Sequence, residues 1–219
     1  MTKVNEHSRI IATAAKAALE PLGLKQKGQS RTWYSDQRFW VIFVEFQPSG
    51  WSRGSYLNIA VKWLWSPGPG WSFSYRPVDF VPFTSAEQFT PLIKAMAARA
   101  AQEVETTRDR FKAFADVYRY LVAHARLDGW PIYNAAVAAG LAGDEETSRQ
   151  LFQQMKDWET YGYDWQLRLK ADSAALAALL SDREKFRAKV LGIIEQGRAL
   201  MKMPPDPNCL EMIGSQSGP

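Results

Sequence analysis

The segment from Arg31 to Trp65 reads RTWYSDQRFWVIFVEFQPSGWSRGSYLNIAVKWLW, and it decides the fold. Aromatic and β-branched residues dominate it, and these residue types favour strands because they fill a pleated, half-buried surface. Six of the nine tryptophans in the chain fall between Trp33 and Trp71. Because aromatic side chains are costly to leave in water, this block must form a core, a binding surface or both.

The pattern of apolar residues predicts three strands within this segment, at residues 31–36, 39–47 and 55–65. The second carries apolar residues on both of its faces, so we expect a central strand that is covered on both sides along part of its length. A short fourth strand at residues 71–75 is expected to lie at an edge, since Pro77 and Pro82 follow and cannot donate to a sheet.

Helical spacing of apolar residues predicts helices on both sides of the strands. An alanine-rich helix is expected at residues 6–22, ended by Gly23. After the strands, Thr84 and Glu87 have the spacing of a capping box, which predicts the start of a helix. We expect Pro91 to mark a restart of this helix or to lie in a first turn. Further helices are expected at residues 130–141, 144–158 and 182–201, the first two as an αα-hairpin.

These elements predict an α+β fold. We expect a three- to four-stranded antiparallel sheet packed by the N-terminal helix and the helices that follow, with a C-terminal helical extension. The expected organisation is an aromatic-rich α+β module at 1–127, a helical subdomain docked on it at 128–203, and a disordered tail at 204–219. The tail is predicted to be disordered because proline, glycine, serine and glutamine replace the apolar pattern after Met203.

The basic charge of the chain is concentrated in its aromatic half. The formal net charge is +4, yet up to Phe83 ten Lys and Arg residues accompany only five Asp and Glu residues. This excess mildly favours an anionic partner in that half, and a solvated basic surface is the alternative.

The single cysteine, Cys209, excludes an intramolecular disulfide. No apolar run approaches the ~20 residues of a membrane span, and no signal-peptide core is present, so we expect a cytoplasmic protein with no membrane partner.

Few residues could carry catalysis or bind a metal. His7 and His124 are the only histidines, and neither has a cysteine or carboxylate at ligand spacing. The glycine-rich segment 66–70 lacks the Lys-Ser/Thr of a phosphate loop. We therefore expect no catalytic residue, no metal site and no cofactor. An enzyme of unknown type is the least favoured alternative, with an acid–base pair left open among Asp36, Glu45 and Asp79.

Several features between residues 8 and 125 occur in the order seen in a bacterial family of uncharacterised proteins. They are a helix-ending turn at 21–28, the aromatic run 32–34, the pair Phe46-Gln47 and the strand 56–59. In these features the chain resembles the domain-of-unknown-function family 4304. It departs from the pattern at Leu24, where that family more often has an aromatic residue. The resemblance implies an α+β module and supplies no activity, substrate or catalytic residue.

A second, local resemblance lies between residues 130 and 158. The run Tyr133–Val137, followed by Gly143-Asp144 and Leu151-Phe152, is similar to one tetratricopeptide-type helical hairpin, with small residues where two helices approach closely. Since such solenoids normally need three or more copies, we interpret this hairpin as a packing unit, with a peptide-binding repeat as the alternative.

The mixed face of the sheet supplies the candidate binding residues. Glu45 and Gln47 share one parity on the second strand, and Tyr56, Asn58 and Lys62 share one on the third. If the two sets meet, they form a polar patch bounded by aromatics, and a Glu45–Lys62 surface pair is the alternative. With nearby tryptophans and arginines, the candidate binding set is Arg38, Glu45, Gln47, Trp51, Arg53, Tyr56, Asn58, Lys62, Trp65, Trp71 and Arg76.

We favour the hypothesis of a non-catalytic protein-interaction module with a protein partner, in a class that includes immunity-type and antitoxin-type proteins. The first alternative is single-stranded nucleic-acid binding, in which Trp51, Trp65 or Trp71 would stack on bases. Glycan recognition by loop tryptophans is a further alternative. Exposure of these rings discriminates among the hypotheses, and we expect Trp63 to be buried and Trp51 and Trp71 to be partly exposed. The sequence does not determine the oligomeric state.

Overall fold

The computed structural model describes residues 6–68, 70, 74–126 and 129–213. Within these residues it contains a five-stranded antiparallel sheet and seven α-helices, so the predicted α+β fold with a C-terminal helical part is confirmed. The chain divides into two compact units. The sheet unit holds the described residues up to Lys62 and from Gly70 to Asp109, and the helical unit holds those of 63–69 and from Arg110 onward.

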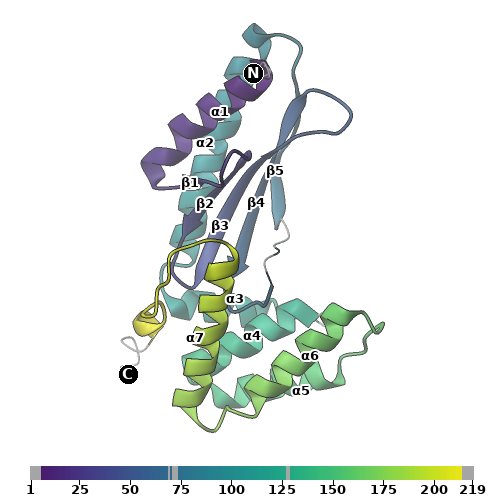
Figure 1. Cartoon of the computed structure of the whole chain (residues 1–219), viewed down its shortest axis with the longest axis vertical. Coiled ribbons are helices and arrows are strands. Elements are labelled where there is room, and N and C mark those ends of the chain that lie inside the picture. Colours follow the sequence, from purple (N-terminus) through teal and green to yellow (C-terminus); the bar gives the residue numbers. More distant parts are fainter. Residues whose placement is uncertain (1–5, 69, 71–73, 127–128, 214–219) are drawn as a thin grey trace. The chain divides into compact units, whose positions relative to one another are not determined.

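The strands follow one another across the sheet in chain order (Figure 1). They are β1 (Lys25–Gln26), β2 (Thr32–Asp36), β3 (Trp40–Gln47), β4 (Gly54–Trp63) and β5 (Tyr75–Pro82). The antiparallel register of β2 and β3 places Trp33 opposite Val44 and Tyr34 opposite Phe43. The three strands predicted within the aromatic segment therefore agree with β2, β3 and β4 to within two residues at each end.

The prediction was wrong at the last strand. The expected strand at 71–75 lies partly outside the described residues, and the observed β5 begins at Tyr75 and includes both Pro77 and Pro82. These prolines are tolerated because β5 lies at the edge of the sheet, where a missing N–H can face solvent instead of a partner strand. The short edge strand β1 was not predicted; it pairs Lys25 with Tyr34.

The aromatic block is mainly interior, as expected. In β3, the residues from Trp40 to Val44 are all buried, and so is Phe46, whereas Glu45 and Gln47 are partly exposed. This pattern confirms that β3 is covered on both faces along most of its length. Burial of each such aromatic or aliphatic side chain contributes about 1.5–3 kcal/mol relative to leaving it in water, so the block stabilises the sheet unit substantially.

Two helices of the sheet unit lie side by side (Figure 1), α1 (Glu6–Leu19) and α2 (Ala86–Arg110). As predicted, a left-handed Gly23 ends the first helical segment, after the 3₁₀ turn Glu20–Leu22. Helix α2 packs on the sheet: the Tyr75 hydroxyl donates to Glu103 Oε2 at 2.5 Å. The Arg108 guanidinium donates to Ser35 Oγ at 2.7 Å.

The start of α2 differs from the prediction by one residue. The capping hydroxyl belongs to Ser85 instead of Thr84. Ser85 Oγ accepts the backbone N–H of Gln88, three residues further on, where the prediction had Glu87. The Gln88 side chain in turn accepts the N–H of Thr84. Pro91 lies inside the helix and not at a restart. It removes one backbone bond only one turn from the start, and the Thr90 hydroxyl donates to the Ala86 carbonyl oxygen there at 2.6 Å.

The helical unit contains five α-helices among its described residues: α3 (Phe114–Ala123), α4 (Gly129–Ala142), α5 (Glu145–Asp157), α6 (Asp164–Ala177) and α7 (Arg183–Leu200). The predicted αα-hairpin is confirmed as α4 and α5, and the predicted last helix as α7. Ser148 of α5 is buried and its hydroxyl donates to the Ala136 carbonyl oxygen of α4 at 2.8 Å, so small residues do mark the close approach of these helices. Helix α6 was not predicted, because two of its four buried positions, Gln166 and Ser173, are polar.

The domain boundaries also differ from the prediction. The helical unit begins at Arg110 instead of 128, and it includes the segment 63–69, which was predicted to belong to the α+β module. Within the helical unit, Trp65 Nε1 donates to Asn134 Oδ1 at 3.1 Å, and the Tyr133 hydroxyl donates to the Trp65 carbonyl oxygen at 3.1 Å. Trp63 stacks on Trp65 with 5.5 Å between ring centres. The tryptophans at the end of β4 thus belong to the core of the helical unit.

The predicted disordered tail was wrong for residues 204–213. Cys209 and Leu210 are buried, and a 3₁₀ turn spans Glu211–Ile213. Helix α7 holds this segment: the buried Arg198 donates from Nε to the Pro204 carbonyl oxygen at 2.7 Å. A buried guanidinium needs acceptors, and here the backbone of the proline-rich segment supplies one. Residues 214–219 lie outside the described residues.

None of the described helices combines the length and the apolarity that a membrane-spanning segment requires.

Candidate functional site

The two polar sets predicted for the sheet do meet on one face. The Asn58 amide nitrogen on β4 donates to Gln47 Oε1 on β3 at 2.6 Å and lies 3.4 Å from Glu45 Oε2. Asn58 is only 3% exposed, so its amide must be paired, and its neighbours on β3 pair it. The odd positions of β3 and the even positions of β4 therefore build one polar cluster.

Arg76 of β5 completes this cluster. Its Nε donates to Asn58 Oδ1 at 3.0 Å and its Nη2 donates to Gln47 Oε1 at 3.1 Å. Its guanidinium carbon lies 4.1 Å from the centre of the Tyr56 ring, and that ring packs against Phe80 with 4.9 Å between centres. The guanidinium is thus held by two amide oxygens and one aromatic face before any partner arrives. We call Glu45, Gln47, Tyr56, Asn58 and Arg76 the sheet cluster.

Lys62 has a different role from the one predicted. Its side chain is 5% exposed, and Nζ donates to the Gly70 carbonyl oxygen at 2.7 Å. Burial of the ammonium group lowers its pKa to about 8. A buried ammonium held by a backbone carbonyl cannot reach a ligand at the surface, so Lys62 leaves the candidate set.

Trp51 is the most exposed large side chain of the aromatic segment, at 98%. It lies in the loop between β3 and β4, where Ser49 Oγ accepts the backbone N–H groups of Trp51 at 3.1 Å and of Ser52 at 3.4 Å. These bonds order the loop and project the indole into solvent. Arg53 follows in the same loop and is also exposed. The exposure expected for Trp51 is therefore confirmed, and is nearly complete.

Two other candidates, Trp65 and Arg38, do not join this site. Trp65 is 0% exposed, because its indole lies in the core of the helical unit, and so it offers no surface to a ligand. Trp71 lies outside the described residues. Arg38 lies at the opposite end of β3, in the turn after β2, with φ +70° and its N–H donating to Asp36 Oδ1 at 2.9 Å. Seven residues of strand, roughly 23 Å, separate it from the sheet cluster. Trp63 is buried, as expected.

A second polar arrangement in the sheet unit was missed by the sequence analysis. Arg31 Nη2 lies 3.2 Å from His7 Nε2 and donates to Ser8 Oγ at 2.8 Å, tying the residue before β2 to α1. Because a guanidinium can only donate, His7 Nε2 accepts, and the ring proton is on Nδ1, a buried atom with no partner among the described residues. Burial lowers the pKa of His7, and the charges of Arg31 and Arg53 lower it further. His7 is thus a neutral structural tether, and no motif in the sequence marks it.

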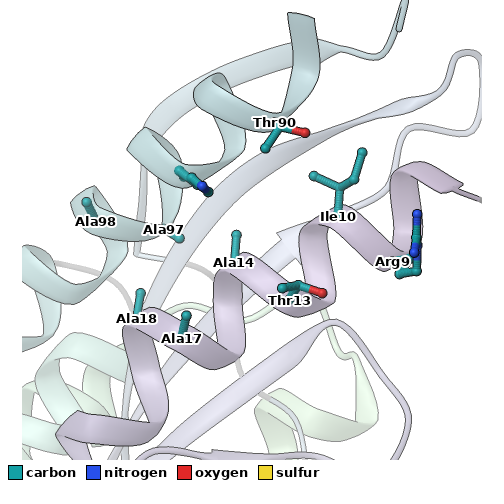
Figure 2. Close-up of a pocket in the computed structure, with 10 residues that line it drawn as sticks. Arg9, Ile10, Thr13, Ala14, Ala17, Ala18, Thr90, Ala97 and Ala98 are labelled. Atoms are coloured by element: carbon teal, nitrogen blue, oxygen red, sulfur yellow. The ribbon is translucent and has the colours of Figure 1, made fainter. Parts of the chain in front are cut away.

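A groove of about 490 Å³ separates α1 and α2 (Figure 2). Alanines dominate its lining, and Figure 2 shows Ala14 and Ala18 pointing from α1 toward α2. Small side chains on both helices leave this space, with Arg9 and Lys94 also along it. The groove therefore offers mainly apolar burial.

The sheet cluster offers hydrogen-bond donors and acceptors, one aromatic face and one charge of each sign. Among the described residues, no group of three or more His, Cys, Asp or Glu side chains is placed to hold a metal ion. The sheet cluster contains one carboxylate and one guanidinium, both engaged with amides. Comparison of the chain with family models, with curated proteins and with solved structures finds no match. The resemblance to the domain-of-unknown-function family 4304 stays a prediction.

Proposed function

We propose that this protein is a non-catalytic interaction module that binds another protein through Trp51 and the sheet cluster. The observation that carries the proposal is Trp51, a tryptophan that is 98% exposed on a loop ordered by Ser49. An ordered, solvent-exposed indole costs free energy that burial in a partner would recover. The loop joins the strands that carry Gln47 and Tyr56, so the indole and the cluster belong to one end of the β3–β4 hairpin.

The residue types on this surface support a protein partner. Trp, Tyr and Arg are the residues that most often dominate binding energy in protein–protein interfaces, and Trp51, Tyr56 and Arg76 are such a set. Arg76 and Tyr56 are held in place by Asn58 and Phe80, so little side-chain entropy is lost when a partner binds. A rigid surface of this kind suits a protein that acts by covering a partner's functional surface, as immunity proteins and antitoxins do.

Nucleic-acid binding is less well supported by the same residues. Continuous single-strand binding uses successive exposed rings, and Trp65 is withdrawn into a core. In the sheet cluster, the Glu45 carboxylate lies 3.4 Å from Asn58 Nδ2 and would repel a phosphate. The Arg76 guanidinium already donates to two amide oxygens. A partner with polar and apolar groups fits this surface better than a polyanion.

The test is to isolate the protein from its native cells and to identify a stoichiometric partner, then to repeat the isolation with Trp51→Ala. We expect the wild type to retain the partner and Trp51→Ala to lose it. Leu200→Ala, which removes a 58% exposed side chain from the helical unit, is the matched control and should retain it. If no stoichiometric partner is found, or if the wild type binds a single-stranded oligonucleotide in a salt-sensitive, Trp51-dependent manner, the proposal is wrong. A salt-insensitive, Trp51-dependent affinity for a glycan would also contradict it.

A further inference from the structure

The helical unit carries a second cluster of aromatic residues, remote in sequence from the segment that decides the fold. A pocket of about 790 Å³ opens beside the connection between α5 and α6. Six of the residues that line it carry its chemistry: Asp157, Trp158, Glu159, Tyr161, Tyr163 and Trp165. We call these six residues the aromatic–acidic pocket. The connection between α5 and α6 can be followed in Figure 1.

The aromatic rings of this pocket are exposed to an unusual degree. Tyr161 is 88% exposed, Tyr163 is 61% exposed and Trp165 is 40% exposed. The two tyrosine rings lie 6.4 Å apart at 50°, and the rings of Trp158 and Trp165 lie 6.0 Å apart at 45°. Several large rings gathered around one hollow at the surface mark an interaction site, whereas single exposed apolar residues are ordinary.

The segment that presents these rings is ordered by its own hydrogen bonds. Gln166 of α6 is buried, and its Oε1 accepts the backbone N–H groups of Tyr161 at 2.9 Å and of Tyr163 at 3.3 Å. Between them Gly162 has φ +78°, which allows the chain to turn there. Lys170 Nζ donates to the Trp158 carbonyl oxygen at 2.7 Å. The pocket is therefore formed before binding, which lowers the entropy cost of recognition.

The charge of the pocket is opposite to that of the whole chain. Asp157 and Glu159 line it, and none of the described lining residues is Lys or Arg, although the chain has a net charge of +4. Neither carboxylate forms an ion pair with another described residue. Asp157 accepts from the neutral Gln153 amide at 2.9 Å. The two negative charges are thus available to a cation.

We infer that the aromatic–acidic pocket binds an arginine-bearing segment of a partner polypeptide. A guanidinium stacks on the faces of Tyr and Trp rings and pairs with carboxylates, and this pocket supplies both. A nucleic acid, which could also stack on the rings, would bring its phosphates against Asp157 and Glu159. The inference goes beyond the proposed function, since it concerns another unit of the chain and does not depend on Trp51.

The probe for this test is a fluorescein-labelled peptide of four Gly-Arg repeats, with binding followed by fluorescence anisotropy. We expect saturable binding to the wild type. Tyr161→Ala and Glu159→Gln should each raise Kd by about threefold or more, because each removes one of the two contacts that a guanidinium makes. Tyr161→Phe keeps the ring and should bind within twofold of the wild type. Both positions are exposed, so circular dichroism should show unchanged folds.

Matched controls separate recognition from general attraction to a charged surface. Glu184→Gln removes an exposed carboxylate from α7 and should leave Kd unchanged. Trp51→Ala removes the 98% exposed indole of the β3–β4 loop and should also leave Kd unchanged, which distinguishes this inference from the proposed function. A peptide of four Gly-Glu repeats should not bind.

Three results would overturn the inference. The first is an equal loss of affinity in Glu184→Gln and Glu159→Gln, which would reduce the binding to net charge. The second is a Kd that Tyr161→Ala leaves unaltered. The third is tighter, Tyr161-dependent binding of a neutral oligosaccharide, such as cellohexaose, than of the arginine peptide.

Discussion

The guanidinium carbon of Arg76 lies 4.1 Å from the centre of the Tyr56 ring, across the pairing of β4 with β5. This contact joins an exposed edge strand to the strand next to it through side chains as well as backbone. It also fixes the direction of the guanidinium, because Asn58 and Gln47 accept from it on the same face. The candidate surface is therefore rigid where a flexible arginine would be expected.

The stacked pair should be measurable as an energetic coupling. We expect Arg76→Ala and Tyr56→Ala to be non-additive, with a coupling of about 0.5–1 kcal/mol in the free energy of unfolding. Urea unfolding of the wild type, the two single variants and the double variant gives this value. The pair Arg76→Ala and Leu200→Ala, whose side chains lie in different units, should be additive within about 0.5 kcal/mol. Strict additivity of the first pair would show that the contact contributes nothing.

The buried amide of the sheet cluster should contribute strongly to stability. Asn58→Ala removes the group that pairs with Gln47 and Arg76, and it leaves their polar atoms partly unsatisfied. We expect a loss of about 1–3 kcal/mol in the free energy of unfolding, measured by urea denaturation. Gln153→Ala, which removes an exposed amide from α5, should change it by less than about 0.5 kcal/mol. Similar small changes in both variants would refute a structural role for Asn58.

The lowered pKa of Lys62 predicts that the stability of the folded protein rises with pH. Its pKa in the folded protein is about 8, whereas an unfolded lysine titrates near ~10.4. Between these values the unfolded chain binds more protons than the folded chain, so the free energy of unfolding increases as the pH rises. The free energy of unfolding is measured by urea denaturation at about pH 7.5 and about pH 10 for the wild type and for Lys62→Met. Between these two pH values the wild type should gain on the order of 1 kcal/mol relative to Lys62→Met. A difference independent of pH would be incompatible with a buried, easily deprotonated ammonium.

Two helical glycines of the helical unit should respond in opposite directions to alanine. A Cβ on Gly140 would lie 2.5 Å from the Phe186 ring, whereas one on Gly192 would meet nothing within 4 Å. Gly140→Ala should therefore destabilise by about 1–3 kcal/mol through overpacking. Gly192→Ala should stabilise by about 0.5–1 kcal/mol through helix propensity. Thermal unfolding of both variants decides the matter, and equal shifts would contradict the packing described for α4 and α7.

The sheet could be predicted from the sequence because its signal is local. Alternation with a period of two gave Glu45 and Gln47 one parity and Asn58 another, and it left open whether the two sets meet. A run of apolar residues on both parities identified β3 as central. The exposure of Trp51 followed from its neighbours Ser49 and Gly50, which are typical of loops. In each case the decisive information lies within a few residues of the one predicted.

The remaining features depend on contacts between distant parts of the chain. Trp65 continues the alternation of β4, and nothing near it indicates that its partner is Asn134, 69 residues further on. Lys62 has the pattern of a surface lysine, and only the position of Gly70 makes it a buried donor. The aromatic–acidic pocket was missed because Tyr161 and Tyr163 lie in a connection without periodicity. The ordered tail was missed because its proline-rich composition is typical of disorder, and the sequence does not show that Arg198 donates to the Pro204 carbonyl oxygen.

The assignment of residues 63–69 to the helical unit has a practical consequence for dissecting this protein. The backbone leaves the sheet unit at Lys62, contributes two stacked indoles to the helical core, and returns at Gly70 before leaving for good at Arg110. A polypeptide beginning at Arg110 would retain the five described helices and lack Trp65, whose indole donates to Asn134 and whose backbone carbonyl accepts from Tyr133. A fragment that starts at Arg110 would therefore lack an indole that is buried in the core of the helical unit.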